Sequence, residues 1–202
     1  MMRNCIVLDA GHGRYGNPYP TIDGKYEGTQ NFIYAGKLAD RLEKAGFSVI
    51  LTRPCIDDDP SLAERGAMAG QNHAVLFLSL HSNAPGTATP PERYPLVRGV
   101  MTFYSLTAKE ENAPFAAALN AAAAEVMQSD NRGIMIREYP GVPEDDYYGV
   151  IRAAAKSGCR QAFLIEHGFH TNLDDATFLT TDDCLERLAD AEAAVIIEYF
   201  GI

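Results

Sequence analysis

The sequence predicts an α/β protein: one domain with a mostly parallel sheet and helices on both faces. Strand-like and helix-like segments alternate from the N-terminus, which is the pattern of such sheets. A chain of 202 residues is long enough for one full core and leaves little room for a second. Hydrophobic residues make up 47% and charged residues 22%, as in ordinary globular proteins. We therefore expect residues 1–202 to form a single domain.

The first part of the chain is expected to form a βαβαβ unit. Its strands are short runs of apolar or β-branched residues, bounded by Gly or polar residues. They are predicted at residues 3–10, 47–52 and 75–81. The first helix is predicted at 28–45, where Gly46 would end it. The second is predicted at 62–72, because Ser61 and Glu64 have the spacing of a capping box.

The second part contains two segments without periodicity. Residues 85–98 hold four prolines and directly follow a strand, so we expect a long loop there. Residues 138–149 are rich in Gly, Pro, Tyr and acidic residues and are expected to form a second loop. The regular elements expected in this part are a strand at 99–104, a helix at 110–128, a buried strand at 161–166 and a helix at 182–199.

Composition narrows the partners and the compartment. The net charge of −10 argues against nucleic acid, because nucleic acid is bound mainly through Lys and Arg. No apolar run approaches the roughly 20 residues of a membrane helix, so no membrane partner is expected. No signal peptide is visible, and no two cysteines are spaced as a CxxC pair. We therefore expect synthesis in the cytoplasm, with Cys5, Cys55, Cys159 and Cys184 reduced.

Three predicted strands carry a His or a Glu at or just after their carboxyl ends. His12 follows the first strand, His81 ends the third, and Glu166 ends the strand at 161–166. In open sheets, sites gather just beyond the carboxyl ends of the strands. We therefore expect these three side chains to form one site assembled from distant parts of the sequence.

The glycines around His12 allow two interpretations. Residues 11–16, Gly-His-Gly-Arg-Tyr-Gly, match the G-x-G-x-x-G pattern of a dinucleotide-binding loop. That pattern requires a helix to begin within the loop, so that its N-terminus meets the pyrophosphate. Pro18 and Pro20 follow instead, and the first helical pattern begins only after Glu27. We therefore expect the glycines to let the backbone bend tightly around His12.

Two His and one Glu form a common ligand set of catalytic zinc, which leaves the fourth position for water. Glu27 stands where the glycine loop enters the first helix, so it can reach the crevice that His12 and His81 share. The spacings between the three residues are not specific by themselves. A lone His at a strand end is also commonly an ordinary polar residue that binds no metal.

Glu166 and the histidines after it allow further alternatives. A carboxylate at the end of a very apolar strand is costly to bury unless it is paired or partly solvated. Glu166 can pair with a nearby Arg, such as Arg152 or Arg160, or act as a general base for the catalytic water. His167 and His170 are a second candidate metal pair if their segment is helical, which the preceding strand argues against.

Together these motifs resemble the type-3 family of zinc-dependent N-acetylmuramoyl-L-alanine amidases. The matching segments occur in the family's order and spread over nearly the whole chain: residues 8–13, Glu27 with Asn31, and residues 46–53, 62–65, 79–84 and 165–172. The resemblance implies a mixed six-stranded sheet, zinc ligands at His12, Glu27 and His81, and a catalytic glutamate at Glu166. It also implies peptidoglycan as the substrate, cleaved at the amide between muramic acid and L-alanine.

Further expectations follow from this resemblance. Asp9 and Asn83 are candidates for orienting the His ligands through hydrogen bonds, and Arg65 is expected to tie a helix to the sheet. Two departures from the family, residues 160–162 and the proline-rich loop after His81, concern substrate preference rather than the reaction. The protein is expected to act on the cell wall, as the catalytic domain of a bacterial autolysin or a phage endolysin.

Two rival functions stay open on the sequence. A zinc carboxypeptidase or aminopeptidase would need a second metal or a cationic clamp, and Arg14, Arg98 and Arg137 lie in loops where a clamp can form. A non-catalytic wall-binding module would not need the four site residues. No feature of the sequence predicts the oligomeric state or the preferred peptidoglycan chemotype.

Overall fold

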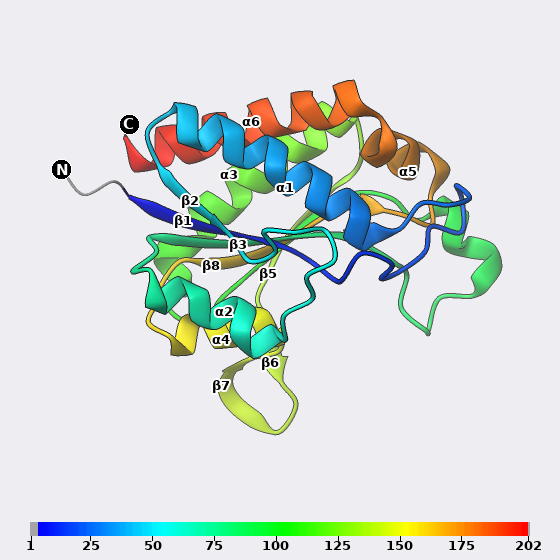
Figure 1. Cartoon of the computed structure of the whole chain (residues 1–202). Coiled ribbons are helices and arrows are strands. Elements are labelled where there is room, and N and C mark those ends of the chain that lie inside the picture. The colour runs from blue at the N-terminus through cyan, green and yellow to red at the C-terminus, as the bar shows by residue number, and fades with distance from the viewer. Residues whose placement is uncertain (1–3, 202) are drawn as a thin grey trace.

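The central sheet has six strands in the order β2-β1-β3-β8-β4-β5 (Figure 1). It belongs to a computed structural model that describes residues 4–201. Strands β1, β2, β3 and β8 run parallel, whereas β4 is antiparallel to β8 and parallel to β5. The predicted mixed, mostly parallel sheet is therefore confirmed. The strands are β1 (Cys5–Ala10), β2 (Ser48–Leu51), β3 (Leu76–Asn83), β4 (Val100–Tyr104), β5 (Asn131–Met135) and β8 (Ala162–Phe169).

Helices cover both faces of this sheet, and each face has its own apolar core. The larger core lies beneath α1, α3, α5 and α6, and the smaller one beneath α2 and α4 (Figure 1). This arrangement is a single-domain α/β fold with helices on both faces, as predicted. The helices are α1 (Glu27–Lys44), α2 (Leu62–Gln71), α3 (Lys109–Met127), α4 (Gly149–Lys156), α5 (Leu173–Thr180) and α6 (Asp182–Phe200).

The two predicted helix boundaries in the first part of the chain are confirmed. The Ser61 hydroxyl accepts a hydrogen bond from the backbone N–H of Glu64, and the Glu64 carboxylate accepts one from the backbone N–H of Ser61. This capping box satisfies N–H groups that would otherwise lack a partner at the start of α2. Gly46 has a φ of 105°, which favours glycine, and it follows the end of α1.

Alternation along the strands places the predicted site residues on one face of the sheet. Phe77 of β3 and Leu164 of β8 pack in the smaller core, beneath α2 and α4. Side chains two residues apart on a strand share a face, so His81 and Glu166 also point toward this side. The two residues are direct partners in the register between β3 and β8. The fold therefore brings them together from positions far apart in the chain.

Several elements were not predicted. They are β5, α4, α5, a 3₁₀ turn at Pro91–Leu96 inside the loop after His81, and a hairpin of β6 (Glu138–Tyr139) and β7 (Val142–Asp146) inside the second loop. Strand β8 also continues to Phe169, beyond the predicted end at Glu166. The hairpin residues are mostly exposed, so no apolar alternation marks them in the sequence.

Within residues 4–201, no helix combines the length and the apolar character that crossing a membrane requires. All four cysteines are free in the structure.

Candidate metal centre

The side chains of His12, Glu27 and His81 converge at the carboxyl ends of β1 and β3. His12 Nε2 lies 3.4 Å from Glu27 Oε1, and His81 Nδ1 lies 3.0 Å from the same oxygen. One ligand atom from each residue falls within 4.8 Å of the others. The structure therefore brings together the three residues predicted as zinc ligands, from a loop, the first residue of α1 and a central strand.

Glycines shape the backbone around His12. His12 itself has a φ of 62°, a left-handed conformation that is uncommon for residues other than glycine. A Cβ atom at Gly11 would lie 2.2 Å from the His81 ring, so only glycine leaves room for that ring. A Cβ atom at Gly28 would lie 1.8 Å from the carbonyl oxygen of Gly13. The glycines therefore fit the close packing of the loop against β3 and α1, and no helix begins in the loop as a dinucleotide site would require.

Glu27 is almost fully buried and is held by several donors. Its carboxylate accepts hydrogen bonds from the Asn17 side chain at 2.8 Å and from the backbone N–H of Ser82 at 3.0 Å. The Asn31 side chain is a third, longer donor at 3.4 Å. Asn17 and Ser82 were not predicted from the sequence, because a loop asparagine and a backbone N–H carry no motif.

The protonation of this cluster follows from burial and mutual contact. Burial raises the pKa of Glu27, but hydrogen bonds and charges of His12 and His81 outweigh burial and hold that pKa well below its usual value. Burial lowers the pKa of His81, but the Glu27 carboxylate outweighs burial and raises it to about 9. The residues fit a divalent cation such as Zn²⁺, because an ionised carboxylate and two imidazoles are its preferred donors.

Glu166 lies beside this cluster without a pairing partner. Its Oε2 atom is buried and makes no hydrogen bond within the described part of the chain. Burial raises the pKa of Glu166 to about 7, and the charge of His81 opposes that rise. Arg152 contacts Asp145 and Arg160 contacts Glu111, so neither forms the ion pair that was one alternative for Glu166. A carboxyl group of this kind is suited to accept and return a proton near neutral pH.

Asp9 and Arg65 form a buried link between β1 and α2. The Asp9 carboxylate accepts hydrogen bonds from Thr52, Arg65 and Ser79 at 2.6–2.8 Å. The Arg65 guanidinium donates further bonds to the backbone carbonyls of Ala10 and His12. The Arg65 side chain of α2 therefore contacts β1 and the residues that follow it.

The expected orientation of the His rings by Asp9 and Asn83 is not what the structure shows. The Asp9 carboxylate accepts its hydrogen bonds from Thr52, Arg65 and Ser79, and not from His12 or His81. The backbone carbonyl of Asn83 accepts a hydrogen bond from the N–H of His170. No bond joins the Asn83 side chain to His12 or His81 within the described residues. Asp9 therefore binds neighbouring side chains and Asn83 a neighbouring backbone N–H, and neither holds a His ring.

His167 and His170 point to different partners and do not form a metal pair. His167 Nε2 lies 2.7 Å from the Glu192 carboxylate of α6, which also accepts a hydrogen bond from the Tyr34 hydroxyl at 2.6 Å. His167 Nδ1 lies 3.2 Å from the backbone carbonyl of His81, where the register of β3 and β8 shifts. The His167 ring thus supports the backbone of β3 at His81 from the opposite face of the sheet.

His170 packs next to the cluster of His12, Glu27 and His81. Its ring stacks on Tyr19 at a centroid distance of 5.2 Å, and its Nδ1 lies 3.1 Å from the Ser82 hydroxyl. His170 Nδ1 is also 3.8 Å from Glu27 Oε2. His73, at the end of α2, is exposed and remote from the site elements.

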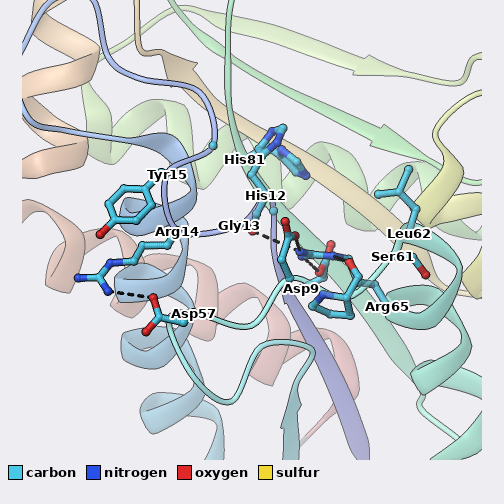
Figure 2. Close-up of a pocket in the computed structure, with 14 residues that line it drawn as sticks. Asp9, His12, Gly13, Arg14, Tyr15, Asp57, Ser61, Leu62, Arg65 and His81 are labelled. Atoms are coloured by element: carbon cyan, nitrogen blue, oxygen red, sulfur yellow. Dashed lines mark hydrogen bonds and ion pairs between the residues drawn. The ribbon is translucent and has the colours of Figure 1, made fainter.

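The cluster opens into a hollow of about 690 Å³ (Figure 2). One wall is the glycine loop with Arg14 and Tyr15, and the other is the segment from Asp57 to Leu62 that leads into α2. His12 and His81 line its inner end. The candidate centre is therefore reachable by a substrate of appreciable size.

Comparisons with known proteins agree with this geometry. A family model described as N-acetylmuramoyl-L-alanine amidase matches residues 6–198. The chain is similar to the catalytic domain of the N-acetylmuramoyl-L-alanine amidase CwlV from Bacillus (Paenibacillus) polymyxa var. colistinus, with 26% identity, a TM-score of 0.78, and coverage of 98% of this chain and 99% of the other. The amidase AmiC2 of Nostoc punctiforme gives 25% identity, a TM-score of 0.76 and 98% coverage of both chains.

A curated relative of unknown function is also similar. The uncharacterized protein YqiI of Bacillus subtilis (strain 168) is 28% identical over 199 residues, which span 96% of this chain and 84% of YqiI.

Proposed function

Because this chain belongs to the type-3 N-acetylmuramoyl-L-alanine amidase family, we propose that it hydrolyses the amide between N-acetylmuramic acid and L-alanine in peptidoglycan. In this proposal residues 1–202 are the catalytic domain, Zn²⁺ is the cofactor, and the protein acts on the cell wall as an autolysin or endolysin. The observation that carries it is the convergence of His12, Glu27 and His81 beside the unpaired carboxylate of Glu166.

His12, Glu27 and His81 would hold the metal ion through two imidazole nitrogens and one carboxylate oxygen. When bound there, Zn²⁺ supplies Lewis-acid chemistry, which polarises the scissile carbonyl and makes a water more acidic. The hydrogen bonds from Asn17 and Ser82 fix the Glu27 carboxylate, so its lone pairs are held toward the two rings. These bonds orient Glu27 before any ligand arrives, and His12 and His81 hold its pKa low.

Glu166 would act as the proton carrier of the reaction. Its carboxylate takes a proton from the attacking water while the water oxygen bonds to the amide carbon. It then delivers that proton to the nitrogen of L-alanine as the carbon–nitrogen bond breaks. The products are a free muramic acid carboxylate and a stem peptide with a free amine. No covalent bond to the protein is needed, and an acid–base group of this kind contributes roughly 10²–10⁴-fold in rate.

The sharpest test replaces the proposed proton carrier and keeps its shape. We expect Glu166→Gln to retain bound zinc but to lose about 10²–10⁴-fold in the rate of muramoyl-peptide hydrolysis. Rates are measured by mass spectrometry of the released peptide, and zinc by metal analysis of dialysed protein. Glu43→Gln, an exposed carboxylate on α1, is the matched control and should behave as wild type.

Other outcomes would point to the rival functions. Release of free amino acids without new muramic acid carboxylates would show a carboxypeptidase or aminopeptidase. Binding to purified walls without any cleavage, with or without zinc, would show a non-catalytic module. Wild-type activity in Glu166→Gln would remove Glu166 from the mechanism.

A further inference from the structure

A second hollow adjoins the one at the candidate metal centre. It has a volume of about 510 Å³ and lies between α2, α4 and the β6–β7 hairpin. Leu62, which is 57% exposed, lines both hollows. Gly149 lets α4 approach this side chain, because a Cβ atom there would lie 2.9 Å from Leu62 Cδ1. The two hollows therefore adjoin at Leu62, the first residue of α2, and we call the pair of hollows the groove.

The second hollow, which we call the aromatic arm, is lined by tyrosines: Tyr139, Tyr147 and Tyr148. Its outer part is the β6–β7 hairpin, which projects beyond α2 and α4 (Figure 1). Its inner part is Tyr148, which packs on Phe103 of β4, a strand that pairs with β8 through Glu166. The charge of Glu166 is among the causes that raise the pKa of Tyr148 to about 12, after burial. The arm therefore reaches from the hairpin to the neighbourhood of Glu166.

Two guanidinium groups lie against the rings of this arm. The Arg137 guanidinium is 3.5 Å from the centroid of the Tyr147 ring, and the Arg152 guanidinium is 4.9 Å from that of Tyr139. Arg152 is partly neutralised by Asp145 and donates hydrogen bonds to the backbone carbonyls of Asp146 and Tyr147. Arg137 is exposed and has no carboxylate within ion-pair distance in residues 4–201. Arg137 is therefore a cation still able to bind an anion.

The first hollow has the opposite character. Its exposed carboxylates, Asp57 and Asp59, pair with Arg14 at 2.9 Å and with Arg65 at 2.9 Å. These two carboxylates are thus already paired within the protein, and the surface suits an uncharged, hydroxyl-rich ligand that bonds to polar side chains. Arg137, beside the aromatic arm, has no such partner among the described residues. An unpaired cation is notable in a chain of net charge −10.

The substrate of the proposed reaction likewise has an uncharged half and a charged half. A neutral sugar lies on one side of the scissile amide, and a peptide that carries free carboxylates lies on the other. We propose that the stem peptide runs along the aromatic arm and that Arg137 pairs with one of its carboxylates, while the sugar occupies the first hollow. This inference rests on the proposed function, and it assigns each half of the substrate to one half of the groove.

The test compares substrates that differ in one carboxylate. Arg137→Met keeps an apolar stem against Tyr147 and removes only the charge. Wild type and variant are assayed on muramoyl-peptides whose second residue has a free carboxylate or an amide, and on a pair whose third residue has or lacks a side-chain carboxylate. We expect kcat/KM to fall about three- to tenfold on the carboxylate form of at least one pair, and to stay within about twofold on its partner.

A control variant and the remaining outcomes distinguish the ways in which this inference can fail. Arg187→Met, an exposed cation on α6, should change neither pair. Equal losses on both members of each pair, or no loss at all, would overturn the assignment of a carboxylate to Arg137. A changed preference between monosaccharide and disaccharide substrates would instead place the glycan in the aromatic arm. If wild type cleaves none of these substrates, the proposed function itself fails and the inference fails with it.

Discussion

The two histidines of the candidate centre are held in different ways. His81 is in the middle of the sheet, paired in register with Glu166, and its side chain is 15% exposed. His12 follows the end of β1 on a glycine loop, in a left-handed conformation, and its side chain is 37% exposed. We call these the strand-held side and the loop-held side of the centre.

The difference shows that the fold meets two requirements in different places: rigidity on the strand-held side and adjustability on the loop-held side. His81 and Glu166 keep a fixed separation because neighbouring strands set it, and His167 with Glu192 supports them from behind. His12 is positioned by turns and by single hydrogen bonds, which cost less to rearrange. A site of this design keeps its proton carrier and one ligand rigid, and it leaves the entrance side able to adjust.

The largest effect is expected from breaking the support of the strand-held side. Glu192→Ala would leave the buried His167 ring and the Tyr34 hydroxyl without their partner. Leaving a buried hydrogen-bonding group without its partner costs about 1–3 kcal/mol, and two groups are affected, so we expect a loss of about 2–6 kcal/mol in the free energy of unfolding, measured with urea. Glu198→Ala, exposed on the same helix, should change stability by less than about 0.5 kcal/mol. Equal stability of the two variants would show that the support is dispensable.

A smaller effect is expected where the two sides meet. Gly11→Ala would place a Cβ atom 2.2 Å from the His81 ring and force that ring away from Glu27. We expect zinc affinity to fall about 100-fold, as determined by competition with a chromophoric chelator. Gly36→Ala, in an open position of α1, should leave zinc affinity unchanged and favour the helix. Unchanged affinity in Gly11→Ala would mean that the strand-held side is less rigid than we infer.

The smallest effect is expected on the loop-held side. Asn17→Ala removes the 2.8 Å hydrogen bond to Glu27 and the 3.1 Å contact with His12. Because Ser82 still holds the Glu27 carboxylate, we expect only about a tenfold loss of zinc affinity, with the same chelator assay. Asn72→Ala, exposed at the end of α2, is the control. A loss as large as that of Gly11→Ala would reverse the proposed ranking of the two sides.

Much of the architecture was predictable because it depends on burial. Strands β1, β3 and β8 are apolar runs beneath helices, so their existence and their polar ends were visible in the sequence. Edge strand β5 was not, because Asn131 and Arg132 begin it and Gly133 interrupts it. The β6–β7 hairpin is exposed, and its register follows from turns rather than from a buried pattern.

The residues that support the site were harder to find than the residues that form it. His12, His81 and Glu166 come at or just after the ends of apolar runs in the sequence, where position alone draws attention. Glu192 was overlooked, although it stands in the apolar stripe of α6 and a lone carboxylate there is a usable signal. Asn17 carries no such signal, because its role depends on the fold of a glycine loop.

The order of the strands has a consequence for how the protein is made. Strand β8, which lies between β3 and β4, is synthesised after every other strand of the sheet. A nascent chain that has emerged from the ribosome only as far as α4 holds two separate pieces of sheet and lacks Glu166. Closing the gap requires contacts between segments far apart in the chain, which form slowly. Translation itself therefore withholds the completed centre until β8 has been made.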